Sequence, residues 1–339
     1  MFDESILGHK EIRAGLLGRL ESGRLPGSLL LVGPDAIGKR RVALEMAQRE
    51  LCFGRTACGH CGGCAAFRAD PLPSAFPNLL RIAPEGKAGL IKVGSIRGDE
   101  VVDGGVIAWA HLAPPPGCHR WVLIEDAHRL NGYSANMLLK TLEEPPPGTF
   151  FLLLTHRPES VLPTIRSRTE RAAFGPLDED SMRRIAHMRG WAWQEIDALL
   201  TLSGGTLKYL EKDSFQRACS QIDAWLSILE GRPFKDVSKE IKGVSESLLP
   251  DKGSDVAQGQ QVAAALEQLL LVLDERERLR HGLPGRLARL DRWGERLRAL
   301  ADRQLDLRSV CARAHDGMRL LNRNAAPESL LRNVALAMG

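Results

Sequence analysis

Four short apolar runs divide the first half of the chain and predict the strands of a sheet. They cover Ser28–Val32, Trp121–Ile124, Phe150–Leu154 and the more polar Asn78–Ile82. Apolar residues follow one another in these runs instead of alternating with polar ones, which is typical of parallel strands buried on both faces. Helical patterns separate the runs, so we expect an α/β core built on a parallel sheet.

Two of the intervening helices have clear limits. Lys39–Glu50 follows the first strand and carries apolar residues at helical spacing. Ser134–Glu144 is similar and stops at three consecutive prolines, Pro145 to Pro147, which cannot continue a helix.

The strand pattern disappears after residue 177 or so, and the rest of the chain predicts helices. Asp178–Met188 and Trp193–Leu202 form two short ones, followed by the glycine pair Gly204 and Gly205. A segment rich in Ser, Gly and Asp, residues 242–259, predicts a loop. The longer helical patterns are Phe215–Leu229, Val256–Arg280, Leu283–Ala301 and Leu305–Asn322. We therefore expect an all-helical C-terminal region packed by apolar stripes.

The composition is that of an ordinary globular protein, and the sequence also indicates a cellular compartment. Of the 339 residues, 44% are hydrophobic and 26% charged, and the formal net charge of +4 permits contact with nucleic acid without arguing for it. We find no signal peptide and no apolar run approaching the roughly 18 residues of a membrane span. We expect a cytoplasmic protein, in which thiols stay reduced.

A phosphate-binding loop follows the first strand. Gly33–Lys39 reads G-x-x-x-x-G-K, in which glycines let backbone N–H groups face a phosphate and Lys39 reaches the outer phosphates. The hydroxyl residue that normally follows the lysine and coordinates Mg²⁺ is replaced by Arg40. Arginine offers no acceptor atom, so we expect the loop not to support magnesium-assisted hydrolysis, and the sequence leaves ATP binding open. The alternative is a glycine-rich turn with a surface lysine.

Two adjacent carboxylates, Glu125 and Asp126, end the second strong strand. In P-loop ATPases an acid at this place holds Mg²⁺. The usual order in AAA+ proteins is Asp then Glu, and here Asp126 is one methylene short of the group that orients the attacking water. A displacement of about 1 Å can lower a rate on the order of 10²-fold. The alternative is a pair of solvated acids at a strand end.

Four of the seven cysteines are clustered as C-x5-C-x2-C-x2-C. Cys52, Cys58, Cys61 and Cys64 could close a tetrahedral structural site, for which zinc is the first choice and an iron–sulfur cluster the second. His60, inside the cluster, is expected to be a spectator. The other cysteines, Cys118, Cys219 and Cys311, are expected to be small buried apolar residues.

From about Ile6–His9 to about Leu210 the chain resembles a known family. Leu130-Asn131 and Ala135–Pro146 resemble a stretch shared by bacterial DNA polymerase III clamp-loader subunits, the AAA+ family that includes the delta-prime and tau/gamma subunits. Leu162–Thr169 is similar to the family's Ser-Arg-Cys segment, with Thr169 in place of Cys. Gly204–Lys208 is similar to its sensor 2 segment.

The resemblance assigns roles to three further residues. Thr155 falls on the sensor 1 position, and Lys208 on the basic sensor 2 position, although a solvated helix lysine explains Lys208 equally well. Arg168 falls on the arginine finger that enters a neighbouring subunit's ATP site. The alternative for Arg168 is a surface arginine capping a short helix.

The resemblance also implies an architecture and partners. We expect an AAA+ P-loop core over residues 1–172 with an inserted zinc module at 52–64, a small helical lid over 173–211, and an all-α collar domain over 212–339. The implied partners are tau/gamma and delta subunits in a five-membered ring, the sliding clamp, and primed DNA reached through the complex, within the DNA-directed DNA polymerase III holoenzyme.

Three functions are consistent with the sequence. The first is a delta-prime stator that donates Arg168 and hydrolyses ATP weakly or not at all. The second is a tau/gamma-type motor, against which stand Arg40, the Glu125–Asp126 order and the lack of the added tail that many motors carry. The third is a DNA-binding or regulatory protein, suggested by the Arg-rich segment Asp274–Arg280, whose interleaved acids favour a solvated helix face.

Overall fold

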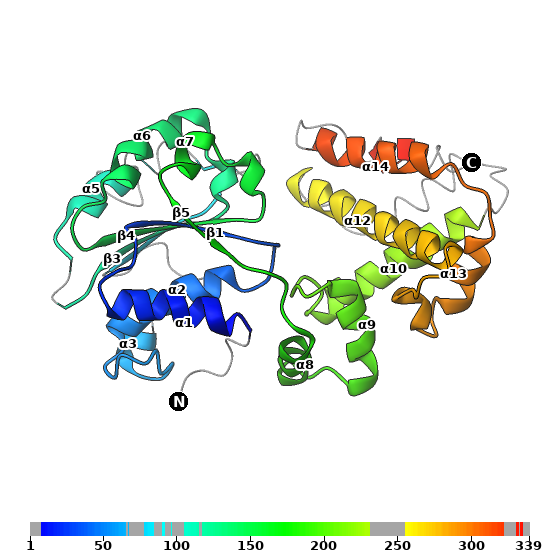
Figure 1. Ribbon diagram of the computed structural model, residues 1–339, viewed down its shortest axis with the longest axis horizontal. Coiled ribbons are helices and arrows are strands. Elements are labelled where there is room, and N and C mark those ends of the chain that lie inside the picture. The colour runs from blue at the N-terminus through cyan, green and yellow to red at the C-terminus, as the bar shows by residue number, and fades with distance from the viewer. Residues whose placement is uncertain are drawn as a thin grey trace. The chain divides into compact units, whose positions relative to one another are not determined.

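The computed structural model forms two compact units. One comprises Met1–Arg189 with Gly205–Leu207, and the other Gly190–Gly204 with Lys208–Gly339 (Figure 1). The residues it describes are 8–65, 67, 78–84, 90–91, 96, 105–114, 117–230, 255–321, 330–331 and 333–334. Within them, none of the helices combines the length and the apolar character that a bilayer crossing requires.

A five-stranded sheet organises the first unit. Its strands are β1 Ser28–Val32, β2 Leu79–Ile82, β3 Arg120–Ile124, β4 Thr149–Thr155 and β5 Glu170–Ala173, in the spatial order β2-β3-β4-β1-β5. All of the pairings are parallel, and in register β1 lies between β4 and β5, with Val32 opposite both Thr155 and Ala173. The carboxyl ends of β1, β3 and β4 therefore meet at one edge of the sheet.

Helices cover both faces of this sheet (Figure 1). On one face lie α1 Lys10–Glu21 and α2 Lys39–Leu51, whose Leu16, Val42 and Met46 pack on the odd-numbered leucines of β1. On the other lie α5 Gly105–His111, α6 Gly132–Glu143 and α7 Pro163–Arg166. Side chains alternate between the faces along a strand, so burial on both sides requires the unbroken apolar runs seen in the sequence.

The four predicted strands are confirmed, and the sheet contains one that the sequence analysis missed. Strand β5 reads Glu170-Arg171-Ala172-Ala173 and only Ala172 is buried. Edge strands carry charged side chains and so lack the apolar signature used to find strands. Helices α1 and α5 were also not predicted.

The remaining helices lie mostly in the second unit. They are α8 Glu179–Met188, which belongs to the first unit, and α9 Trp193–Ser203, α10 Lys212–Leu229, α12 Asp255–Arg280, α13 Gly294–Ala301 and α14 Leu307–Leu321. The fold class expected from the sequence is therefore confirmed: a parallel α/β core with a cysteine module, followed by a helical region. The division into core, lid and collar at residues 172 and 211 stays a prediction.

Two predicted segments in the second unit differ from the structure. The helix expected over Leu283–Ala301 begins only at Gly294, because residues 281–293 form turns and a short 3₁₀ helix, Leu287–Arg289. The buried Glu275 carboxylate accepts backbone N–H groups from Arg286 and Leu287 at 2.8 and 2.9 Å, which stabilises this turn. The loop expected over 242–259 overlaps the start of α12, and its earlier part lies outside the described residues.

The first prediction concerns the N-terminus of helix α6, which packs on one face of the sheet. The Asn131 side chain accepts the Ser134 backbone N–H at 2.8 Å and caps this helix. We expect Asn131→Ala to lower the free energy of unfolding by ~1 kcal/mol, measured by urea denaturation. Asn136→Ala, at an exposed position inside the same helix, serves as the matched control and should be neutral or slightly stabilising. Equal losses in both variants would contradict the capping role.

Candidate functional site

The phosphate loop connects β1 to α2 and depends on two glycines. Gly33 has φ 152°, and a Cβ there would lie 2.3 Å from the backbone oxygen of Phe174. Gly38 has φ 96° and precedes the first residue of α2, Lys39. Both positions require the conformational freedom of glycine, Gly33 also because of close packing.

The loop is held by hydrogen bonds to segments distant in the sequence. Its Ala36 carbonyl accepts the Leu207 backbone N–H at 2.6 Å, and its Ile37 carbonyl lies 2.8 Å from His9 Nε2. Lys39 Nζ donates to the carbonyls of Gly33 and Pro34 at 2.9 and 2.5 Å. Burial lowers the pKa of Lys39, and the ammonium is satisfied by the loop's own backbone.

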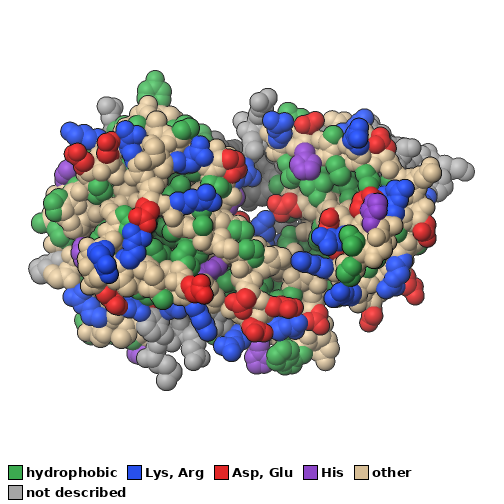
Figure 2. Space-filling model, viewed as in Figure 1, with side chains coloured by type: hydrophobic (Ala, Val, Ile, Leu, Met, Phe, Trp, Pro, Cys, Tyr) green, Lys and Arg blue, Asp and Glu red, His purple; other side chains and the backbone are tan. Residues whose placement is uncertain are grey.

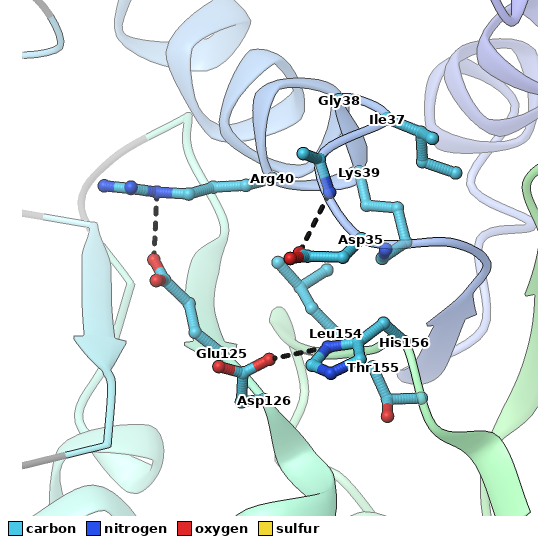
Figure 3. Close-up of a pocket in the computed structure, with 11 residues that line it drawn as sticks. Asp35, Ile37, Gly38, Lys39, Arg40, Glu125, Asp126, Leu154, Thr155 and His156 are labelled. Atoms are coloured by element: carbon cyan, nitrogen blue, oxygen red, sulfur yellow. Dashed lines mark hydrogen bonds and ion pairs between the residues drawn. The ribbon is translucent and has the colours of Figure 1, made fainter. Parts of the chain in front are cut away.

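A cavity of about 270 Å³ opens beside the loop, and Figure 3 shows its lining. It gathers six of the predicted nucleotide-binding residues: Gly38, Lys39, Arg40, Glu125, Asp126 and Thr155. Of the other two, Gly33 does not line the cavity but accepts a hydrogen bond from Lys39, and Lys208 belongs to the second unit. The sheet explains this, because residues after β1, β3 and β4 meet at the same edge.

Glu125 is already paired with two guanidinium groups. Its Oε1 lies 3.0 Å from Arg40 Nε and 2.6 Å from Arg81 Nε, and its side chain is only 17% exposed. Arg81 reaches it from β2, whose Ile82 pairs with Ile124. The carboxylate at the usual magnesium-binding place is therefore neutralised by fixed positive charge. Sequence reasoning missed Arg81, although a lone charge inside the apolar run Asn78–Ile82 was a usable signal.

Asp126 lies beside two histidines that were also not predicted. It has φ 48°, a left-handed conformation uncommon for a non-glycine residue, and its Oδ1 lies 3.3 Å from His156 Nδ1. The hydrogen bond from His156 lowers the pKa of Asp126. The rings of His128 and His156 meet edge to face at 4.5 Å, and His128 Nδ1 lies 3.1 Å from Thr155 Oγ1. Burial lowers the pKa of His128 to about 4, so this imidazole is neutral at pH 7.

The four clustered cysteines form a second centre at the end of α2. Cys52 directly follows that helix, and Cys64 lies in the short helix α3, Gly62–Ala65. One sulfur from each of Cys52, Cys58, Cys61 and Cys64 lies within 4.8 Å of the others. Cys219 is buried as predicted, whereas Cys118 and Cys311 are only half-buried.

The chemistry of this cluster fits a four-thiolate metal site. Burial raises the pKa of Cys52, but N–H groups of Cys58, Thr56 and Gly54 outweigh it and bring the pKa to about 5. A Cβ at Gly63 would lie 1.7 Å from the Leu51 carbonyl oxygen, so the close packing of α3 against the end of α2 depends on glycine. The sulfur positions are compatible with zinc, and an iron–sulfur cluster uses the same donors.

Arg168 lies away from the loop, in a second cavity of about 580 Å³. Its Nε pairs with Glu143 Oε2 at 2.7 Å, and Nη1 donates to the Thr164 carbonyl at 3.2 Å. Ser28, the first residue of β1, lines this cavity, whereas the phosphate loop follows the last. The four residue steps of β1, at about 3.3 Å each, separate its two ends by roughly 13 Å.

Lys208 belongs to the second unit. Its Nζ pairs with Glu267 Oε2 on α12 at 3.1 Å, and the side chain is one-third exposed. The sensor 2 role expected from the sequence stays a prediction.

Three curated DNA polymerase III subunits are similar to about half of this chain. DNA polymerase III subunit delta' of Pseudomonas aeruginosa is 36% identical over 179 residues, 52% of each chain, and its namesake from Escherichia coli is 33% identical over 167 residues, 48% and 47% of the two chains. DNA polymerase III subunit gamma/tau of Mycobacterium tuberculosis is 31% identical over 183 residues, 53% of this chain and 30% of the relative. The chain thus matches about half the length of its delta' relatives.

A solved structure and a family model extend these comparisons. The gamma subunit-related protein of DNA polymerase III from Thermotoga maritima aligns over 96% of this chain and 98% of its own, at 16% identity and a TM-score of 0.48. The family model described as DNA polymerase III, delta subunit, matches residues 8–178, which include the phosphate loop, the cysteine module, the paired acids and Arg168. The chain belongs to this family of DNA polymerase III clamp-loader subunits.

Proposed function

We propose that the chain is a delta-prime-type stator of the clamp loader, which donates Arg168 to the ATP site of a neighbouring subunit and does not itself turn over ATP. The observation that carries this proposal is the pairing of Glu125 with Arg40 and Arg81 in the chain's own pocket. A magnesium ion there would lack the loop hydroxyl and would meet a carboxylate already bound to two cations.

Asp126 does not compensate for the loss. It is the shorter of the two acidic side chains, and its carboxylate lies 3.3 Å from His156 instead of extending free into the cavity (Figure 3). Lys39 likewise donates to its own loop. Each polar group that would serve phosphoryl transfer thus has a partner within the chain.

Arg168 is suited to act on another subunit. It lies at the opposite end of β1 from the chain's own phosphate loop, so it cannot serve that loop without a large rearrangement. Its side chain is 32% exposed and its partner Glu143 57% exposed. Exposed ion pairs contribute only ~0–1 kcal/mol, so docking of a neighbour's nucleotide could displace Glu143 readily.

The motor alternative has some support and meets a specific objection. Gamma/tau relatives match almost the same length of chain as the delta' relatives do, and the pocket has the general form of an ATP site. Similarity alone does not separate the two functions. The side chain at position 40 favours the stator, because an arginine cannot take the place of a magnesium-binding hydroxyl.

The DNA-binding alternative is weakened by the Arg-rich segment of α12. Arg278 pairs with Asp274 at 2.7 Å, and Arg276 is buried, with its guanidinium donating to the Leu300 and Arg303 carbonyls. On the face in view, acidic and basic side chains are interspersed (Figure 2). We accordingly propose that the chain works in the cytoplasm in a five-subunit ring, through which it contacts the sliding clamp and primed DNA. The collar, residues 212–339, would be the oligomerisation domain, and Lys208 in the helical lid would be the sensor 2 residue.

We further propose that Cys52, Cys58, Cys61 and Cys64 hold one structural zinc ion. Four thiolates leave no open coordination position, so the ion would stabilise the module and take no part in catalysis. The module is anchored by Arg55, which donates to the Gly117 carbonyl at 2.9 Å, close to the start of β3.

The first test concerns the chain's own pocket. We expect the purified chain to turn over ATP no faster than the assay background, because its metal ligands are missing or already paired. The measurement is phosphate release with Mg²⁺ in excess, with Lys39→Ala as the control that removes any P-loop activity. Turnover on the order of 1 s⁻¹ that Lys39→Ala abolishes would assign the chain to the motor class.

The second test concerns Arg168. In a complex reconstituted with the cognate motor subunit, Arg168→Ala should abolish the ATP turnover that depends on adding this chain, since a trans arginine contributes ~10³–10⁵ in rate. Arg168→Lys should also be inactive, because an ammonium does not reproduce the guanidinium fork. Arg166→Ala, on the exposed surface two residues away, is the matched control. Gel filtration checks that every variant assembles, and undiminished turnover in an assembled Arg168→Ala complex would remove the finger assignment.

The third test concerns the cysteine module. We expect one equivalent of zinc in the purified protein by atomic emission, and none in Cys58→Ser, with a lower unfolding midpoint because metal binding is coupled to folding. Cys118→Ser, outside the cluster, should retain the full equivalent. Iron and acid-labile sulfide in place of zinc would identify a cluster instead.

A further inference from the structure

Three metal-ligating side chains converge at the carboxyl edge of the sheet, apart from the cysteine module. Asp126 follows β3, His128 lies in the 3₁₀ helix Ala127–Arg129, and His156 follows β4. One ligand atom from each lies within 4.8 Å of the others, and Asp126 Oδ1 is 3.3 Å from His156 Nδ1. Tetrahedral coordination with bonds of about 2.0–2.1 Å places ligand atoms roughly 3.3 Å apart, so this pair already has the required spacing.

The third ligand, His128, is oriented by its neighbours. Thr155 Oγ1 accepts the Arg157 backbone N–H at 3.0 Å and lies 3.1 Å from His128 Nδ1. In the tautomer that protonates Nδ1, this nitrogen donates to Thr155 and leaves Nε2 with a free lone pair. Nε2 is enclosed and has no hydrogen-bond partner among the described residues. Histidines that bind metals commonly have this arrangement: one ring nitrogen donates to a fixed acceptor, and the other ring nitrogen is free to bind the metal.

We propose that Asp126, His128 and His156 bind a divalent transition-metal ion of the zinc class. Two imidazoles and a carboxylate suit zinc, cobalt or nickel, whereas magnesium prefers oxygen ligands throughout. Three protein ligands leave a fourth coordination position, and the cavity lined by Asp126 and His156 is where an exchangeable water or anion would fill it (Figure 3). The inference shares Asp126 and His156 with the stator proposal but uses neither Arg40 nor Arg168, so the ATP-turnover and cobalt tests can fail separately.

Nearby charges set the expected strength of this site. Lys39 and Arg129 are positively charged and interact with the Asp126 carboxylate. They therefore disfavour the binding of a metal cation at Asp126. The site should therefore bind metal more weakly than the four thiolates do, and it should exchange while the cysteine module stays loaded.

The test is a cobalt titration of the full chain whose cysteine module has been filled with zinc and freed of excess metal. We expect one further Co²⁺ to bind with the d–d absorption of a nitrogen–oxygen site and without the sulfur-to-cobalt charge-transfer band that exchange at the cysteines would give. His156→Ala should weaken this binding at least 10-fold and leave the bound zinc unchanged. His281→Ala, 70% exposed in the second unit, is the matched control.

A second variant separates ligand loss from misfolding. Thr155→Val removes the acceptor that orients His128 but no ligand, and loss of such a partner weakens metal binding ~10–100-fold. Circular dichroism and retained zinc show whether each variant is folded. The proposal is overturned if the wild-type chain takes up no cobalt beyond the cysteine site, or if folded His156→Ala and Thr155→Val bind it as tightly as wild type does.

Discussion

Burial of the central strands on both faces is the constraint on which the rest of the structure depends. The side chains of β1 and β3 are buried at every position, so no polar group along these strands can reach solvent. Chemistry is confined to the strand ends. The carboxyl edge receives the phosphate loop, the paired acids and two histidines, and the amino edge receives Arg168. One sheet thus supports two centres without either sharing a residue with the other.

Charge pairing then decides what the carboxyl edge can do. Arg40, at the position where P-loops usually carry a hydroxyl, forms an ion pair with Glu125. Arg81, on the neighbouring strand β2, forms a second ion pair with the same carboxylate. A carboxylate between two guanidinium groups is a well-satisfied ion, but it is a poor ligand for a further cation. These two ion pairs neutralise Glu125 and hold together one wall of the pocket. Asp126 takes no part in these ion pairs, and its carboxylate contacts His156 instead.

The sequence predicted the parts of this arrangement that periodicity and short motifs record. The apolar runs found four of the strands, and G-x-x-x-x-G-K together with the Glu125–Asp126 pair found most residues of the cavity. It missed β5 because an exposed edge strand such as Glu170–Ala173 has no apolar pattern. It misplaced the start of α13 because the Glu275 carboxylate stabilises turns over a segment with helical spacing. Arg81 and His156 were missed because their roles arise from strand register and tertiary proximity.

The phosphate loop shows why a motif and its chemistry have to be judged separately. Gly33 packs against the Phe174 backbone, the Ala36 carbonyl accepts a hydrogen bond from Leu207, and Lys39 satisfies two loop carbonyls. Each of these contacts stabilises the junction between β1 and α2 whether or not a phosphate is present. The glycines and the lysine thus report loop geometry, which the fold needs for its own packing. The chemistry of the pocket depends on other side chains, and the guanidinium of Arg40 offers no lone pair to a metal and pairs with Glu125.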